Sequence, residues 1–484
     1  MNRYRQAIVA KLFTVKHWRE LGLRLGWKAM HPLDDRLVAA LPKGSLYAVG
    51  GRVRDEVRAQ LAGTEAPAAD SDYVVVGFST DELVERLMTL GRVDVVGASF
   101  AVVKLTVDGR TVDVATPRLE RSFGPGHRDF EIEAGPQVTL QEDLSRRDFR
   151  MNMMARALPS GELVDPYAGQ ADIAARRIDI LTPQTFREDP LRMLRAAQFT
   201  ARFQYEVTPA VREGMRAAAA LAKSISAERV HDELVKLFAA SKPSVGLKLL
   251  EETGVLAELW PELVEGLGVE QNEWHAFDVW HHNLATIDAT PPGDLILRLA
   301  ALLHDVGKPR TKDGPHFYRH EIVGAELAHA MLERFRFPHD TVGATEHLVK
   351  QHMYSADPSL SEPGLRRFIR RIGPENIERL FALRHADICG SGLPKRDGSN
   401  EAFEARVRAE LARKPAFSIR ELAVTGDDVI AALVRRGEAP AGFKGDERVG
   451  AALRWLFEQV TDEPERNERS LLLRTLEQYL AGTA

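Results

Sequence analysis

Two acidic residues stand two positions apart at the start of a β-rich run, Asp70 and Asp72 in the sequence DSDYVVV. Side chains two residues apart in a strand point to one face of the sheet. Two neighbouring carboxylates repel each other unless a cation lies between them, and Mg²⁺ is the usual cation where substrate phosphates share it. A third acid, Asp113 in RTVDVA, fits a two-metal site with this pair or an outward-facing polar position. Taken alone, Asp70 and Asp72 also fit a solvated turn.

A pair of glycines, Gly50 and Gly51, separates the apolar run SLYAV from the helical pattern RVRDEVRAQLA. A Gly-Gly turn at a helix N-terminus leaves backbone N–H groups free to face an anion such as a phosphate. Arg54 falls in the first turn of the expected helix, where its guanidinium can reach the same phosphates. Many turns of this kind bind nothing, so this motif is weak on its own.

An aspartate and two arginines stand close together at another expected helix start, in REDPLRMLR. Pro190 suits the first helical position, which makes Asp189 the N-cap and places Arg192 and Arg195 on one face. An ionised Asp only accepts hydrogen bonds, and Arg only donates them. One of each complements the amino donor and ring-nitrogen acceptor that cytosine and adenine share, and it mismatches guanine and uracil. Plain helix capping by Asp189, with surface arginines, is the other interpretation.

Eleven of the 15 histidines lie between His275 and His385, a density that predicts a separate metal-binding unit. His304 and Asp305 directly follow the apolar stretch LILRLAALL. Adjacent His and Asp at the end of an apolar helix, completed by distant His and Asp side chains, suit a divalent metal.

The elements that must position these residues change along the chain. From Ser45, SLYAV, DYVVVGF, SFAVVKLTV and RTVDVATPR read as short strands, and Asp108–Gly109 between the last two is a hairpin signal. Apolar residues recur at helical spacing from about Asp143 onward. The segment between Arg121 and Val138 is long enough for a mobile loop, which fits an enzyme that must switch between bases. The fold class is therefore α+β, a small mixed β-sheet head followed by all-α parts.

Five motifs occur here in the same order as in the class II tRNA nucleotidyltransferases, the CCA-adding enzymes and bacterial poly(A) polymerases. They are GGRVRD, DSDYVVV, RRDFRMN, DPY and EDPLRMLR. The resemblance covers roughly residues 45–270, and LAVTGDDVI through Leu473 also resembles the C-terminal part of bacterial members. One departure is Tyr73, which stands where the family often has Leu or Phe.

This resemblance implies site residues. Asp70 and Asp72 would be the catalytic acids that hold Mg²⁺, and Asp113, from its place on the expected hairpin strand, is the third candidate catalytic acid. The nucleotide-binding residues would be Gly50, Gly51 and Arg54 at the triphosphate, Asp148 and Asn152 near the ribose, Arg147 near the nucleotide, and Asp189, Arg192 and Arg195 at the base.

Residues 275–390 resemble the HD phosphohydrolase superfamily. By position, the metal ligands would be His282, His304, Asp305 and Asp387, with His320 and His352 able to hold a second ion. The neighbouring His281 leaves the choice of His282 uncertain by one residue. The resemblance implies a divalent metal here, such as Mg, Mn or Ni, at a metal-dependent phosphatase or cyclic phosphodiesterase site, and a vestigial site is the alternative.

The sequence thus predicts five parts. They are a helical extension (1–36), a nucleotidyltransferase head (37–156), a helical neck and body that bind nucleotide and RNA (157–270), an HD-type metal domain (271–400) and a helical RNA-binding tail (401–484). Helices near residues 192–236 and 366–384 carry basic residues expected to grip RNA.

The expected function is tRNA 3′-end addition of C and A from CTP and ATP, with pyrophosphate release. A poly(A) polymerase, or an enzyme that adds only CC or only A, remains open. So does an HD phosphohydrolase whose N-terminal half merely binds RNA, and an RNA-binding scaffold without turnover.

Composition narrows the class of protein. The net charge of −5 requires any RNA binding to use local basic patches. A single cysteine, Cys389, excludes a secreted disulfide scaffold and fits a reducing compartment. The N-terminus has no apolar signal core, and the most apolar segment, 295–303, contains Arg298 and predicts a buried helix rather than a membrane span. The expected location is cytoplasmic, without membrane contact, and the sequence leaves the oligomeric state open.

Overall fold

The computed structural model describes residues 31–67, 71–96, 102–122, 130–394, 398–413 and 415–482. The chain divides into two compact units, Met1–Glu233 with Lys248–Leu259, and Leu234–Leu247 with Trp260–Ala484. Most of the expected N-terminal extension, and Asp70, lie outside the described residues. Within the described ranges, no helix is both long enough and apolar enough to cross a membrane.

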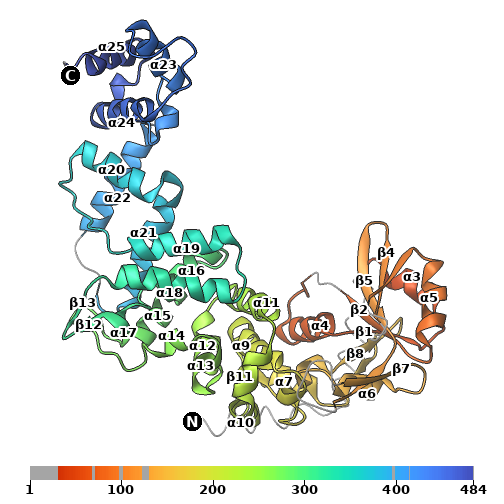
Figure 1. The fold of residues 1–484 in the computed structure, drawn as a ribbon. Helices are drawn as coiled ribbons and strands as arrows, with labels where there is room; N and C mark the ends of the chain where they lie inside the picture. Colours follow the sequence, from red (N-terminus) through yellow and green to blue (C-terminus); the bar gives the residue numbers. More distant parts are fainter. Residues whose placement is uncertain are drawn as a thin grey trace. The chain divides into compact units, whose positions relative to one another are not determined.

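A mixed seven-stranded sheet carries the first predicted site. In spatial order its strands are β3 (Arg92–Val96), β4 (Val102–Val107), β5 (Arg110–Ala115), β2 (Asp72–Val75), β1 (Leu46–Val49), β8 (Ala155–Ala157) and β9 (Leu163–Val164). The β2–β5 pair is parallel and the other pairs are antiparallel. In Figure 1, α4 (Gly51–Ala62) and α5 (Thr80–Met88) lie on opposite sides of this sheet. The α+β expectation is confirmed.

Two predicted turns have the backbone that their residues favour. Asp108 and Gly109 have φ of 50° and 74° and join β4 to β5, so the predicted hairpin is confirmed. Gly50 has φ of 72° and ψ of −141° between β1 and α4, a combination open essentially only to glycine.

The predicted loop between Arg121 and Val138 is wrong in part. β6 (Arg118–Ser122) and β7 (Phe130–Ala134) pair antiparallel there. Residues 123–129 lie outside the described part. The alternating β-branched and aromatic signal was weak in both strands, because glutamate and arginine fill half of their positions.

Helices make up the rest of the first unit. They are α3 (Asp34–Ala40), α6 (Leu140–Ser145), α7 (Gly169–Ala174), α8 (Thr185–Glu188), α9 (Leu191–Phe203), α10 (Pro209–Ala218), α11 (Ala227–Phe238), α12 (Pro243–Glu252) and α13 (Val255–Leu259). Both α11 and α12 continue across a boundary between the units. A short parallel pair, β10 (Arg177–Ile178) and β11 (Glu206–Val207), lies among them.

The second unit is helical. Its helices are α14 (Pro261–Val264), α15 (Val279–Asp288), α16 (Leu295–Leu303), α17 (Lys308–Thr311), α18 (His320–Arg334), α19 (His339–Gln351), α20 (Glu362–Ile372), α21 (Ile377–Gly390), α22 (Ser399–Ala412), α23 (Gly426–Arg435), α24 (Glu447–Asp462) and α25 (Arg469–Leu480). One hairpin, β12 (Lys312–Asp313) with β13 (His316–Phe317), interrupts them.

The apolar helix α16 is buried, as the sequence predicts. Arg298 is fully buried within it, and its guanidinium donates to the backbone carbonyls of Phe238 and Ala240. These bonds satisfy a charged group that would otherwise be costly to bury.

Candidate functional site

The Gly-Gly turn brings a predicted metal ligand and a predicted nucleotide contact together. A Cβ added at Gly50 would lie 3.2 Å from Oδ2 of Asp72 and 3.6 Å from Nη1 of Arg147. Arg147 is oriented by the buried Asp143, whose Oδ2 accepts from Nη2 at 3.1 Å. A side chain at position 50 would therefore press on the Asp72 carboxylate, and the positive φ of this residue also favours glycine.

Two of the three predicted catalytic acids are neighbours across parallel strands. Asp72 on β2 pairs in register with Asp113 on β5. The carboxylate of Asp113 is 44% exposed and lies 3.7 Å from Nζ of Lys104 on β4. Two carboxylates at adjacent strand positions, open to solvent, are the oxygen donors that a hard divalent cation requires.

A second cluster joins four predicted nucleotide-binding residues. Buried Asp148 accepts from Nδ2 of Asn152 at 2.8 Å and from Nε of Arg195 at 2.7 Å. Oδ1 of Asn152 in turn accepts from Nη1 of Arg54 at 3.0 Å. Burial opposes ionisation of Asp148, but Arg195, Asn152 and the Phe149 N–H together hold the pKa of that carboxyl below its usual range. The cluster fixes the helix that follows Gly51 against α9.

Arg54 does not stand ready for a phosphate as the sequence suggests. Its guanidinium is buried, pairs with Asp55 at 2.8 Å and lies over the rings of Phe199 and Phe203. It therefore packs the turn onto α9 as well as contacting Asn152.

The predicted template residues, Asp189 and Arg192, are three positions apart and bind different partners. Oδ2 of Asp189 accepts from Arg229 at 2.8 Å, whereas Nη1 of Arg192 donates to Glu188 at 3.1 Å and Nη2 donates to the carbonyl of Arg146. The helix starts at Leu191, one residue later than predicted, yet Oδ1 of Asp189 accepts from the Leu191 N–H as an N-cap does.

The predicted metal ligands of the second unit converge. Nε2 of His282 lies 3.0 Å from Nε2 of His304 and 3.2 Å from Oδ1 of Asp387. Oδ2 of Asp305 lies 3.2 Å from Nε2 of His304. The neighbouring His281 is exposed and turns to Asp278, so His282 is the residue at the cluster.

The other oxygen of Asp305 faces the second predicted pair. Oδ1 lies 3.4 Å from Nε2 of His320 and 3.6 Å from Nε2 of His352. Burial disfavours the charged form of Asp305, yet His304 and Lys308 hold its pKa well below the usual value. One carboxylate thus lies between two groups of imidazoles, and the described residues contain three triads able to hold a cation here.

A cavity of about 470 Å³ opens over this cluster. Asp305, His320, His352 and Asp387 line it. Nitrogen and oxygen donors facing such a cavity fit a divalent metal with room for a substrate phosphate.

Three family models match separate stretches of the chain. Residues 46–179 match the poly A polymerase head domain, 204–267 the probable RNA and SrmB-binding site of polymerase A, and 282–390 the HD domain. A multifunctional CCA protein of Verminephrobacter eiseniae (strain EF01-2) is 34% identical over 431 residues, covering 86% of this chain and 100% of that relative. This chain belongs to the multifunctional CCA protein family. Another member, from Xanthomonas campestris pv. campestris (strain B100), is 35% identical over 405 residues, or 79% of this chain and 93% of its own.

The fold of this chain is similar to that of solved CCA-adding enzymes. The CCA-adding enzyme of Bacillus stearothermophilus in complex with CTP has a TM-score of 0.65 at 23% identity, covering 94% of this chain and 99% of that one. The Thermotoga maritima CCA-adding enzyme complexed with tRNA has a TM-score of 0.51 at 18% identity, covering 98% of each chain.

Sequence reasoning missed residues that support both sites of this CCA family member. Asp143 orients Arg147. Its spacing of three and four residues to Arg146 and Arg147 is the sequence signal that could have identified it. Lys308 donates to Oδ2 of Asp305 at 2.6 Å. His275 lies beside His282, with ring centroids 4.8 Å apart. Burial and nearby Lys308 lower the pKa of His275 to about 4, so its ring is neutral at pH 7.

The basic residues of α20, one of the helices expected to bind RNA, form ion pairs within this chain. On α20, Arg366 bonds Glu410 at 2.6 Å, Arg370 bonds Glu458 at 2.7 Å, and Arg367 bonds the side chain of Asp462. These ion pairs tie α20 to α22 and α24, and RNA contact by this helix stays a prediction.

Proposed function

We propose that this protein adds C and A to the 3′ end of tRNA from CTP and ATP, without a nucleic-acid template. The proposal is supported by its membership of the multifunctional CCA protein family and by relatives of the same fold solved with CTP and with tRNA. The observation that carries it is the approach of Asp72 and Arg147 at Gly50, because a metal-binding acid and a cation then lie together at the turn proposed to hold the triphosphate.

In the proposed reaction, the terminal hydroxyl of the tRNA attacks the α-phosphate of the nucleotide, and pyrophosphate leaves. Asp70, Asp72 and Asp113 are the proposed ligands of Mg²⁺, whose contribution is a lowered pKa of the attacking hydroxyl and a stabilised leaving oxygen. The Gly50–Gly51 amides and Arg147 hold the triphosphate, and positioning supplies much of the rate enhancement.

The remaining proposed contacts select the nucleotide. Asp148 and Asn152 face the ribose, with Arg54 and Arg195 fixing them through the bonds described above. Asp189 and Arg192 present one acceptor and one donor to the base. Their partners Arg229 and Glu188 hold both side chains in place before a nucleotide arrives.

The experiment that tests this function uses three tRNAs, ending before CCA, after C and after CC, each incubated with labelled CTP or ATP alone. A full CCA-adding enzyme extends the first two with CTP and the third with ATP. Addition of A to every end identifies a poly(A) polymerase. Addition of C alone, or of A to the third tRNA alone, identifies a partial enzyme. Asp72→Ala should abolish every addition while tRNA binding survives, and an active Asp72→Ala enzyme would refute the assignment.

A second activity is favoured by the histidine cluster. We propose that His282, His304, Asp305 and Asp387 hold a divalent metal, Mg, Mn or Ni, at a phosphohydrolase site, with His320 and His352 able to hold a second ion. The double variant His304→Ala, Asp305→Ala should lose metal-dependent phosphoester hydrolysis and keep nucleotide addition. Loss of addition in this variant would contradict two independent sites.

The five-part division of the chain and a cytoplasmic location complete the proposal. The lone Cys389 suits a reducing compartment. A protein that hydrolyses phosphoesters but incorporates no nucleotide would favour the HD phosphohydrolase with an RNA-binding N-terminal half.

A further inference from the structure

Three histidines of the metal cluster share one orientation. In each of His304, His320 and His352, Nδ1 donates to the backbone carbonyl three residues earlier. The acceptors are Ala301, Phe317 and Val349, at 2.9, 2.7 and 2.6 Å. Such a bond fixes the ring and its tautomer, so Nε2 presents a lone pair to a cation.

His275 repeats this arrangement from a loop outside the HD match. Its Nδ1 lies 3.0 Å from Oδ1 of Asn272, again three residues earlier. The same oxygen accepts the backbone N–H of Trp274 at 3.2 Å. Since that atom is an acceptor, Nδ1 of His275 carries the proton, and Nε2 has the free lone pair.

The loop that carries His275 is fastened to the cluster at two points. The N–H of Ala276 donates to the carbonyl of Ser391, just beyond the helix that bears Asp387, at 2.8 Å. Oε1 of Gln271 accepts from Nζ of Lys308 at 2.6 Å, and the same ammonium binds Asp305. His275 is therefore held in position before any metal binds, which reduces the entropy cost of coordination.

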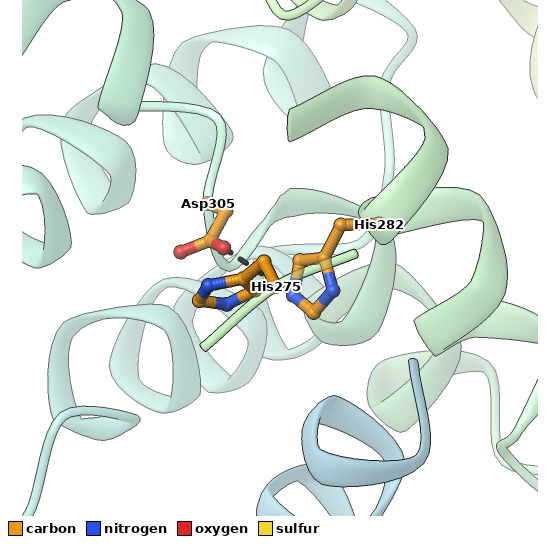
Figure 2. Close-up of side chains that lie close together, drawn as sticks. All are labelled: His275, His282 and Asp305. Atoms are coloured by element: carbon orange, nitrogen blue, oxygen red, sulfur yellow. Dashed lines mark ion pairs between the residues drawn. The ribbon is translucent and has the colours of Figure 1, made fainter. Parts of the chain in front are cut away.

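We propose that His275 is a ligand of the metal centre, beside His282 and Asp305 (Figure 2). One ring nitrogen of His275, one of His282 and a carboxylate oxygen of Asp305 all lie within 4.8 Å of one another. This inference rests on the metal centre proposed above. A further imidazole makes the donor set richer in nitrogen, which favours a first-row transition ion over Mg²⁺.

The test titrates metal-free, full-length protein with Co²⁺ and follows both the heat of binding and the visible absorption of the bound ion. His275→Ala should weaken binding about 100-fold or more, beyond the roughly 10- to 100-fold effect of groups that only support ligands, and should change the absorption spectrum. Added imidazole should restore the wild-type spectrum, which a merely unfolded loop would not allow. The matched control is His281→Ala, which removes an exposed ring next to His282.

The outcomes separate this inference from the metal centre itself. If His304→Ala loses the site while His275→Ala binds Co²⁺ with wild-type affinity and spectrum, His275 is not a ligand and the centre stands. If the wild-type protein binds no Co²⁺, or His304→Ala binds it as well as wild type, the proposed centre fails and this inference fails with it.

Discussion

The hydroxyl of Tyr73 donates a hydrogen bond of 2.6 Å to Oδ1 of Asp34. Both residues are buried, and Arg52 donates to both oxygens of the same carboxylate, at 2.8 and 2.6 Å. Burial and Asp34 raise the pKa of Tyr73, so its hydroxyl stays a donor. Tyr73 follows Asp72 on β2, and the network therefore ties the strand of a proposed catalytic acid to α3. Tyr73, which stands where the family often has Leu or Phe, therefore has a structural role in this chain.

We expect Tyr73→Phe to destabilise the first unit by about 1–3 kcal/mol, because it removes a bond to a buried carboxylate. The measurement is denaturant unfolding of the full chain, with hydrogen exchange of β2 to locate the effect. Tyr47→Phe on the adjacent strand β1 is the control, since it deletes a half-buried tyrosine hydroxyl elsewhere in the sheet. If both variants lose the same free energy of unfolding, the bond from Tyr73 to Asp34 contributes no more than the hydroxyl of Tyr47.

Acid should weaken the same network. Burial raises the pKa of Asp34, but Arg52 and Tyr73 lower it more, to below its ordinary value of 3.8. A carboxylate with a depressed folded-state pKa stabilises the protein above its unfolded value and loses that contribution as pH falls through the folded one. The stability advantage of wild type over Asp34→Asn should thus be constant near neutral pH and shrink below about pH 4. An advantage that persists undiminished at about pH 2 would contradict the assignment.

Gly50→Ala should reduce nucleotide addition about 10-fold or more, because the Asp72 carboxylate would have to move by a few tenths of an ångström and misplacing a catalytic group lowers the rate. The new Cβ would meet Asp72 at 3.2 Å, and the positive φ adds strain. Steady-state addition of C to tRNA measures the loss. Gly63→Ala is the control: Gly63 ends the same helix with φ of 68°, and a Cβ there meets nothing within 4 Å. If both variants lose activity equally, backbone strain rather than contact with Asp72 is the cause.

Arg192→Ala should let UTP and GTP compete better with CTP and ATP. A well-placed bidentate contact discriminates by about 1–3 kcal/mol, or roughly 5- to 150-fold in relative incorporation. The measurement is competition between all four nucleotides on one tRNA end. Arg187→Ala, which removes an exposed arginine from α8, should leave the preference unchanged. An unaltered preference in Arg192→Ala would refute the template role.

Short sequence patterns predicted the structural features that are set by residues close together in the chain. The glycine turn, the Asp-Gly hairpin and the buried helix with Arg298 follow from backbone preferences and apolar spacing, and all are confirmed. The convergence of His282, His304 and Asp387 was implied by family resemblance, and it depends on the packing of separate helices.

Contacts between distant segments were beyond the sequence patterns. Nothing local indicates that Arg54 binds Asn152 instead of solvent, because the partner lies 98 residues away. The partner of Asp189, Arg229, is also far away in the sequence, at 40 residues. His275 was not assigned a role because it lies on the loop before α15, where spacing carries no periodic signal.

The path of the chain has a practical consequence for dissecting the molecule. Because Leu234–Leu247 belongs with the second unit and Lys248–Leu259 with the first, the backbone crosses from one to the other three times. No single protease cut or gene truncation can release both intact. A recombinant fragment that starts at residue 271 would leave the guanidinium of Arg298 without the Phe238 and Ala240 carbonyls, so a stable fragment of the second unit has to include both of these residues.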